Sequence, residues 1–456
     1  MAEKSGTFDA AQLRALMEQL GVGDVGQTKL EREEAEAKEA AHEFWSTQPV
    51  PQTAEVVKRD EAVHGPLAQS EIRQEPYELP SASMTWCEVD VEDEGQMREL
   101  YTLLTENYVE DSDSMFRFDY SAEFLKWALM APGYRAQWHV GVRDSDGGLI
   151  GFISGIPMRV MVRSSAMEMA DINFLCLHKS LRSQRMAPLL IKEVTRRVHL
   201  EGIFQAVYTV GRLLPKPVAT CRYFHRSINA RKLMETGFSP RLEGVQLART
   251  LAALRLPRET ATPGLREMRR SDVPQVRKLL NRFLKSRFEL VPVFSTDAEV
   301  VHWLLPRDSV VWTYVVEEGG KITDFFSFYA LPSTVLGAKR RAVKAAYLFY
   351  YATQSDYNVQ LTDDERTACG GIKRERALVR EKTTELVGER LRKVMHDMLI
   401  LARDAGFDVV NCLDMMDNSL FASDLRFGPG DGFLRYYLFN YRARPIDANK
   451  VGFVML

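Results

Sequence analysis

The sequence predicts a mixed α/β fold made of two related halves. Its 456 residues exceed what one hydrophobic core usually serves, so two core-bearing units are expected. Helix-like and strand-like patterns alternate along residues 76–255 and again along 256–456. The order of these patterns repeats at a nearly constant spacing, because Trp303 follows Trp127 by 176 residues (303 − 127) and Pro332 follows Pro157 by 175 (332 − 157).

The composition argues against several classes of protein. Hydrophobic residues make up 45% of the chain, charged residues 27%, and the net charge is −2. A general nucleic-acid binder needs a basic face, which this balance does not favour. The five cysteines are widely spaced and form no Cys-x-x-Cys pair, which argues against disulfides and zinc clusters and favours a reducing compartment. No stretch resembles a signal peptide or a membrane span, so we predict a cytoplasmic protein.

Residues 1–75 differ from the rest and are predicted to form a largely flexible N-terminal arm. An apolar stripe near its start, ending at Gly21, indicates one short amphipathic helix. Residues 29–43 are dense in charge and have almost no apolar face, which is typical of a mobile segment. An arm that binds a partner is the alternative. The arm's folded end is expected at Phe44 and Trp45, two adjacent aromatic residues suited to anchor on the body or on a ligand.

Residues 76–255 are expected to form the first half. The predicted elements are helices at 97–108 and 122–130, a hairpin of strands 137–143 and 149–156, a strand at 166–179, a helix at 188–201, a strand at 204–210 and a short helix at 230–235. Asp146-Gly147-Gly148 supplies the turn of the hairpin. An acidic stretch with several aromatic residues, 108–120, separates the first two helices.

Residues 256–456 are expected to form the second half, after a linker at 256–264 that is rich in proline and turn-forming residues. A helix near Trp303, a hairpin of 310–316 and 325–329, and a strand at 344–351 repeat the order of the first half. The following helix ends at Gly406, which leaves an excess of about 28 residues relative to the first half. That excess predicts a polar surface insertion near 358–385, partly helical and outside the core.

The stretch from Lys179 to Pro188 is a basic loop between the apolar strand and the helix. Proline suits the first helical turn, where its missing N–H costs nothing. Lys179, Arg182 and Arg185 therefore lie beside the unpaired N–H groups of a helix N-terminus. Such a loop is suited to bind a phosphate or pyrophosphate. The alternative interpretation is a solvated turn.

Several motifs resemble known families. Arg182-x-x-Arg185-x-Ala187 approximates the pyrophosphate loop of the GCN5-related N-acetyltransferase (GNAT) fold, with Arg185 at a position where glycine is usual. The segment 171–179, Asp-Ile-Asn-Phe-Leu-Cys-Leu-His-Lys, closely resembles the first signature of the glycylpeptide N-tetradecanoyltransferase (N-myristoyltransferase) family. The segment 426–432, Arg-Phe-Gly-Pro-Gly-Asp-Gly, resembles its second signature, and with the Val-Met-Leu ending it looks most like fungal members.

The resemblance runs from about residue 42 to 456 and implies a fold and an activity. It implies two tandem GNAT-like halves with pseudo-twofold symmetry, the first binding myristoyl-CoA and the second mainly binding peptide. The reaction is transfer of myristate to the N-terminal glycine amine of proteins, including nascent ones. No cofactor beyond myristoyl-CoA, no metal and no nucleic-acid substrate is implied. We expect a monomer, and the N-terminal arm is a candidate contact with the ribosome.

The resemblance also assigns catalytic roles. The base is the free carboxylate of the last residue, Leu456, and the backbone N–H groups of Phe174 and Leu175 stabilise the oxyanion. Asn173 and Thr209 help to position the amine. Consecutive N–H groups of a regular strand point in opposite directions, so both can face one oxygen only at a bulge. We therefore predict irregular backbone at residues 173–176.

Further contacts are implied for the two substrates. Those implied for acyl-CoA are Glu43, Phe44, Trp45, Phe174, Leu175, Cys176, Leu177, Arg182, Ser183, Gln184, Arg185, Met186, Ala187 and Pro188. Those implied for the peptide are Tyr108, Val109, Asp111, Asp113, Phe116, Phe118, Tyr223, His225, Ser327, Tyr347, Asp431 and Gly432. Glu43 departs from the pattern, because an uncharged or basic residue is expected there.

The residues also bear on other chemistries. Cys176 alternates with apolar residues along a strand and has no evident His/Asp partner, so direct transfer is favoured over an acyl-cysteine intermediate. His178 alone is more often structural than a base. The alternatives are another GNAT-fold CoA-dependent acyltransferase, using a shorter acyl chain or a small amine, and a catalytically silent acyl-CoA-binding protein.

Overall fold

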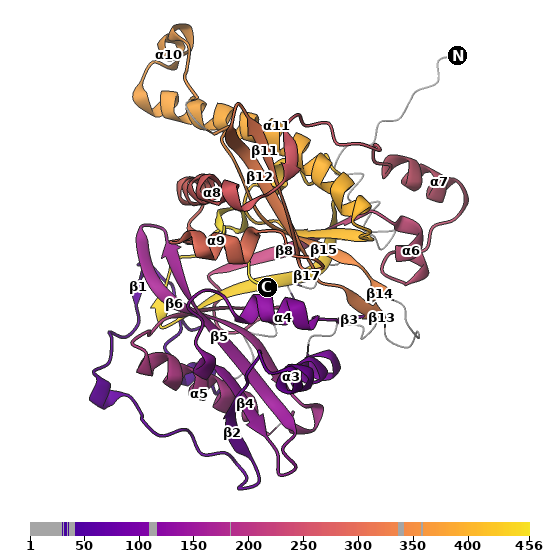
Figure 1. The fold of residues 1–456 in the computed structure, drawn as a ribbon. Helices are drawn as coiled ribbons and strands as arrows, with labels where there is room; N and C mark the ends of the chain where they lie inside the picture. The colour runs from indigo at the N-terminus through magenta and orange to yellow at the C-terminus, as the bar shows by residue number, and fades with distance from the viewer. Residues whose placement is uncertain are drawn as a thin grey trace.

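The structure, a computed structural model, describes residues 30, 32, 33, 35, 42–108, 116–182, 184–335, 342–356 and 359–456. The short helix expected near the start of the arm lies outside these residues. In the described part of the chain a 13-stranded sheet forms the centre, and helices pack on its faces (Figure 1). The prediction of a mixed α/β fold is confirmed.

The first half contains the predicted elements in their predicted order, together with short strands, the strand at Ala219–Ser227 and the helix at Gly244–Ala253, which were not predicted. Its helices and strands are β1 (Glu61–Ala62), β2 (Thr85–Glu88), α3 (Glu94–Asn107), β3 (Phe116–Phe118), α4 (Ala122–Leu129), β4 (His139–Arg143), β5 (Leu149–Val162), β6 (Ser165–Leu177), α5 (Met186–Leu200), β7 (Ala206–Val210), β8 (Ala219–Ser227), α6 (Ala230–Glu235) and α7 (Gly244–Ala253). Two capping side chains define helix starts, since Asp93 accepts from Gln96 N and Ser121 accepts from Phe124 N.

The second half repeats this order with additions. Its helices and strands are β9 (Leu265–Glu267), α8 (Val273–Arg287), β10 (Leu290–Pro292), α9 (Asp297–Leu304), β11 (Val311–Glu318), β12 (Lys321–Ala330), β13 (Ser333–Val335), β14 (Ala342–Val343), β15 (Ala345–Thr353), α10 (Asp363–Cys369), α11 (Ile372–Asp404), β16 (Val409–Leu413), β17 (Gly428–Phe439) and β18 (Tyr441–Arg442).

The two halves share one continuous sheet rather than packing as separate sheets. Its order is β2-β4-β5-β6-β7-β17-β8-β16-β15-β12-β11-β9, with β10 pairing on β5. In each half one pair of strands is parallel, β6 with β7 and β15 with β16. The two halves also exchange strands. β17 of the second half pairs with β7 of the first, and β8 of the first half pairs with β16 of the second. This exchange joins the halves about the central β17–β8 pair and confirms that they are related.

The equivalent helices α4 and α9 meet between the halves. The Trp127 indole N–H donates to the carbonyl oxygen of His302 (2.9 Å), and the Nε2 atom of His302 lies 2.7 Å from the carbonyl oxygen of Trp127. Trp303 packs edge-to-face on Trp127, with ring centroids 5.2 Å apart. Trp127 and Trp303, which are equivalent in the sequence repeat, are thus in contact with each other.

Two of the differences from the expectations concern the basic loop and the expected insertion. Helix α5 begins at Met186, not at Pro188, because Arg185 adopts a left-handed conformation (φ 55°) and ends the loop before the helix. Pro188 still falls within the first turn. In the region of the expected insertion, α10 and the start of α11 project away from the sheet (Figure 1), and the buried residues of α11 begin only at Val387.

The arm packs on the body from His42 onward. Val50 and Val57 are buried, and β1 pairs with β18 near the end of the chain. Farther upstream, the described residue Glu33 forms an ion pair with the fully buried Arg435, with 2.5 Å between the charged atoms. A charge-dense segment thus supplies the counter-charge of a buried arginine.

Candidate active site

Strand β6 is irregular at the predicted position. Phe152 pairs with Cys176 and Ser154 with Asn173, so Ile153 faces both Phe174 and Leu175. Phe174 has φ 54°, a left-handed conformation that is uncommon for residues other than glycine and often marks functional sites. The predicted irregularity at 173–176 is confirmed.

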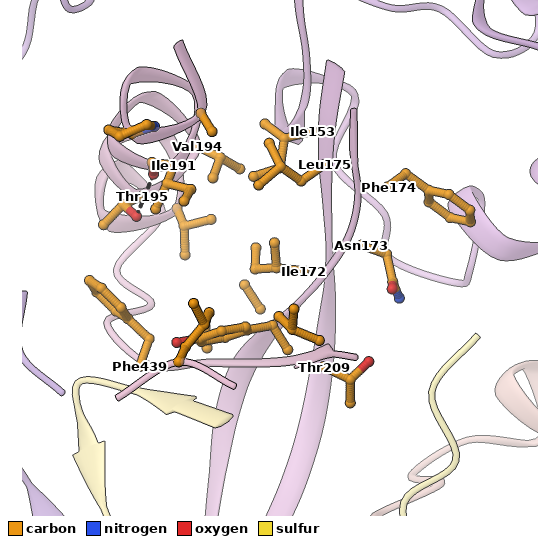
Figure 2. Close-up of a pocket in the computed structure, with 18 of the residues that line it drawn as sticks. Ile153, Ile172, Asn173, Phe174, Leu175, Ile191, Val194, Thr195, Thr209 and Phe439 are labelled. Carbon is orange, nitrogen blue, oxygen red and sulfur yellow. Dashed lines mark hydrogen bonds between the residues drawn. The ribbon is translucent and has the colours of Figure 1, made fainter. Parts of the chain in front are cut away.

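A cavity of about 350 Å³ opens between β6 and β7. These strands pair only from Ala170 to Ile172, opposite Ala206 to Tyr208, and diverge beyond. Side chains from β6, β7 and α5 line the space, and most of them are apolar. Figure 2 shows Ile172, Leu175 and Ile191 around it. Its shape and lining suit an apolar ligand.

The end of the arm forms part of the wall of this cavity. Phe44 and Trp45 both line it. The Trp45 ring stacks on Tyr208 (5.6 Å between centroids), and Tyr208 stacks on Tyr437 (5.2 Å). The aromatic pair therefore lies against both the body and the cavity.

The basic loop leads from the cavity to the start of α5. Ala187 and Pro188, in the first turn of α5, also line the cavity. Arg182 donates to the carbonyl oxygen of Asn107 (2.8 Å), and the side-chain oxygen of Asn107 accepts from the N–H of Lys179 (3.0 Å). These bonds tie the loop to the end of α3.

Arg185 and Glu43 form an exposed ion pair at 3.1 Å, with side chains 83% and 74% accessible. A carboxylate thus lies beside a cation of the predicted phosphate loop.

Other predicted acyl-CoA contacts have different surroundings. Met186 is fully buried, so its side chain packs in the core rather than facing a ligand. Leu177 is half-buried against the same core cluster, and Gln184 donates to the carbonyl oxygen of Ser180 (3.1 Å). Cys176 is buried with its sulfur 3.7 Å from the carbonyl oxygen of Leu103, and burial raises the pKa of its thiol to about 12. Ser183 lies outside the described residues.

The opposite face of β6 carries polar groups. Asn173 and Thr209 stand at the edge of the cavity, and Figure 2 shows their side chains directed to the side away from Ile172 and Ile191. The side-chain N–H of Asn173 donates to Asp171 Oδ1 (3.2 Å), and burial raises the pKa of Asp171 to about 7. Sequence reasoning did not single out Asp171, although a carboxylate in the middle of an apolar strand was a usable signal.

The C-terminal tail passes close to this polar face. Tyr350 on β15 accepts from Val454 N (3.1 Å) and donates to Val454 O (3.3 Å). The charge of Asp171 is near enough to Tyr350 to raise the pKa of the tyrosine further. Met455 is buried and Leu456 half-buried against the core. The end of the chain therefore lies inside the molecule (Figure 1).

Aromatic residues form a continuous cluster beside the bulge. Tyr108 packs on Phe174 (6.0 Å between centroids), Phe118 on Tyr347 (6.4 Å), and Tyr347 on Tyr223 (6.5 Å). These residues come from both halves of the chain, and all except Phe174 are half-buried. The structure thus brings the predicted peptide contacts into one aromatic surface.

The cluster continues to the second signature. Phe116 packs on Phe238 (5.7 Å), which also contacts His225 (5.6 Å). His225 Nδ1 lies 2.7 Å from the side-chain oxygen of Asn411, and burial lowers the pKa of the imidazole although the nearby Asp431 opposes that shift.

The remaining predicted peptide contacts are placed as follows. Gly432 is half-buried and Asp431 exposed on β17. Ser327 is fully buried, and its hydroxyl bonds both the N–H and the carbonyl oxygen of Tyr350, so a peptide has no access to it in this conformation. Val109, Asp111 and Asp113 lie outside the described residues.

Among the described residues, no group of three or more His, Cys, Asp or Glu side chains is arranged to hold a metal ion. No helix in the same part of the chain has the length and apolarity needed to cross a membrane.

Two family models match the chain. "Myristoyl-CoA:protein N-myristoyltransferase, N-terminal domain" matches residues 63–221, and "Myristoyl-CoA:protein N-myristoyltransferase, C-terminal domain" matches residues 235–454. The chain belongs to the N-myristoyltransferase family. It is therefore an acyltransferase, and the recognition from the two signatures is confirmed.

Relatives of the N-myristoyltransferase family match along most of the chain. A probable glycylpeptide N-tetradecanoyltransferase of Caenorhabditis elegans is 46% identical over 97% of this chain and 93% of its own. Glycylpeptide N-tetradecanoyltransferase 2 of Danio rerio is 49% identical, over 92% and 78%. The Mycosarcoma maydis enzyme is 45% identical, over 91% and 67%, so these matches do not single out the fungal type.

A solved structure supports the same conclusion. The crystal structure of Saccharomyces cerevisiae N-myristoyltransferase with bound myristoyl-CoA is 42% identical and superimposes with a TM-score of 0.83, over 91% of this chain and 99% of that one. Myristoyl-CoA is therefore a ligand of that similar protein.

Proposed function

We propose that this N-myristoyltransferase transfers myristate to the N-terminal glycine amine of proteins by direct attack, with the Leu456 carboxylate as base and the N–H groups of Phe174 and Leu175 as the oxyanion hole. The observation that carries the proposal is the position of the bulge. It lies between the apolar cavity on one face of β6 and the polar groups near the C-terminal tail on the other.

The steps balance without a cofactor. The glycine amine, with a pKa of roughly 8, arrives mostly protonated, and the Leu456 carboxylate takes one proton. The nitrogen then forms a bond to the thioester carbon, and the carbonyl oxygen becomes an oxyanion that the two N–H groups stabilise. Collapse breaks the C–S bond, the amine loses its second proton to the departing thiolate, and the products are the amide and coenzyme A.

Direct attack is supported over an acyl-cysteine intermediate. Burial raises the pKa of Cys176 to about 12, and its sulfur faces α3 rather than the cavity. A thiol in this state is a poor nucleophile at neutral pH. Asn173 and Thr209, at the edge where β6 and β7 diverge, are proposed to hold the amine.

The substrates are assigned to the features described above. The acyl chain occupies the cavity between β6 and β7, and the pyrophosphate of coenzyme A lies at the N-terminus of α5 beside Arg185. The peptide lies along the aromatic surface from Tyr108 to His225. We further propose that the protein acts as a monomer in the cytoplasm and that its arm contacts the ribosome.

The test is CoA release from myristoyl-CoA and a glycine-initiated peptide. We expect release by the wild type, release at a similar rate by C176S, and a loss of about 100-fold or more in kcat when Leu456 is deleted. The dissociation constant for myristoyl-CoA should change little in that deletion. Unchanged kcat would remove the carboxylate from the mechanism, and transfer from acetyl-CoA alone would overturn the assigned acyl substrate.

A further inference from the structure

Asp171 is a buried carboxyl group that the proposed mechanism does not use. It is 6% exposed, and among the described residues its hydrogen-bond partner is the side-chain amide of Asn173 (3.2 Å). A buried carboxylate without a cation costs stability unless it serves another purpose. Asp171 lies three residues before Phe174, the first residue of the bulge.

Strand geometry places Asp171 on the same face of β6 as Asn173. Residues i and i+2 share a face, and so do residues paired in register. Asp171 is paired with Val207, so Asp171 and Asn173 share a face with Val207 and Thr209. The alternate residues, Ile172 and Tyr208 among them, line the acyl cavity on the other face.

The surroundings on that face complete the arrangement. The hydroxyl of Tyr350 is hydrogen-bonded to the Val454 backbone in the tail. The charge of Asp171 lies near enough to this hydroxyl to raise its pKa. The neighbours of Asp171 in register, Ile156 on β5 and Val207 on β7, are apolar. Asp171 and Asn173 thus form a bonded polar pair among apolar neighbours.

The chemistry of the pair decides how Asn173 is oriented. Asp171 Oδ1 accepts the side-chain N–H of Asn173, and in its ionised form the carboxylate can only accept, so it holds the N–H end of the amide toward itself. The amide oxygen is then the end that remains for another partner. A glycine ammonium is purely a donor and requires such an oxygen.

We propose that Asp171 is a positioning residue for the transfer reaction, orienting the Asn173 amide so that its oxygen receives the substrate ammonium. The proposal rests on the proposed function. Replacing Asp171 by Asn would supply a side-chain N–H that can donate to the Asn173 side-chain oxygen. The Asn173 amide would then turn its NH₂ group, which cannot accept a hydrogen bond, toward the substrate amine.

The experiment is a double-mutant cycle in the full-length protein. The variants are D171N, N173A and D171N/N173A, assayed for kcat and KM with a glycine-initiated peptide and for the myristoyl-CoA dissociation constant. We expect D171N to lower kcat/KM by about tenfold with myristoyl-CoA binding unchanged, and the double variant to be no slower than N173A. D171E should restore part of the loss, because it keeps an acceptor that cannot donate.

Controls separate a positioning role from a structural one. D397N replaces another buried aspartate, which caps the Ala261 and Thr262 amides, and should leave kcat/KM unchanged. D171S removes the carboxylate without adding an amide and serves if D171N does not fold. Wild-type kcat/KM in D171N and D171S, or independent losses that multiply in the double variant, would overturn the proposal. Absence of transfer by the wild type would instead show that the proposed function has failed.

Discussion

The two halves contain the same opening between parallel strands, and they use it differently. Strands β6 and β7 pair over three residues and then diverge around a cavity of about 350 Å³. Strands β15 and β16 also pair over three residues and diverge, but only about 20 Å³ remains there. Val454 and Met455 of the C-terminal tail line what is left of that second opening.

The bulges beside the two openings also differ. In the first half the residue that faces Phe174 and Leu175 is Ile153, which has no hydroxyl, and the hydroxyl of the next residue, Ser154, donates to the Asn173 carbonyl oxygen (3.0 Å). In the second half Ser327 occupies the equivalent place and bonds the Tyr350 backbone on both sides. In the second half the residue facing the bulge thus bonds both backbone groups of one bulge residue, and the chain end fills the opening beside it. The opening in the first half is free for a ligand, and the filling of the second brings the chain end toward the first.

The largest effect is expected when the cavity between β6 and β7 is filled. Ile191 on α5 lines the cavity, and I191W should occupy much of its volume. We expect myristoyl-CoA affinity to fall by about 100-fold or more, because the acyl chain loses its apolar site, with little change in folding. Isothermal titration with myristoyl-CoA and with CoA alone checks this. Affinity for CoA should be nearly unchanged, and equal losses for both ligands would contradict the assignment of the cavity to the acyl chain.

The second test removes a tail side chain from the opening between β15 and β16. Met455 is 5% exposed, and M455A should lower the free energy of unfolding by about 2–4 kcal/mol through lost burial and a new cavity. Turnover should fall too, since the carboxylate of the next residue loses its support. Denaturant unfolding and CoA release measure the two effects. V454A, at a half-buried position, is the matched control with a smaller loss, and full stability in M455A would show that the tail does not fill the opening.

The third test concerns the buried carboxyl group of Asp171. Burial raises the pKa of Asp171 to about 7, above its value of about 3.9 when unfolded. Its favourable contribution to stability is therefore complete below about pH 4 and is lost as pH rises through 7. We expect D171N to gain a few °C in Tm over the wild type at pH 8 and less at pH 5. A Tm difference that does not change with pH would contradict the buried charge.

The smallest expected effect concerns the loop at the mouth of the cavity between β6 and β7. Glu43 pairs with Arg185 on the surface, where the carboxylate opposes a bound pyrophosphate. We expect E43Q to tighten myristoyl-CoA binding by about two- to threefold at low salt. The gain should fade at high salt, whereas E43D should bind like the wild type. Weaker binding by E43Q at every salt concentration would mean that Glu43 supports the loop instead.

Sequence patterns predicted the parts of the site that depend on local spacing. The strand and the helix around the basic loop were expected within a few residues of β6 and α5. The bulge was expected because the family resemblance assigns two successive N–H groups to one oxygen, which a regular strand does not allow. The start of α5 was placed at Pro188 instead of Met186. That shift arises from the left-handed backbone of Arg185, which residue preferences do not reveal for a non-glycine residue.

By itself the sequence determined the repeat, the alternation of elements and the two family signatures, because these depend on residue order and on periods of two and 3.6 residues. Only the tertiary structure decided that β8 and β17 cross between the halves, that Ser327 bonds the backbone of one bulge and that Asp171 lies behind Asn173. These features pair residues far apart in the chain or depend on which face of a strand a side chain occupies. Pairing and packing across the whole sheet select them, and local sequence does not encode that choice.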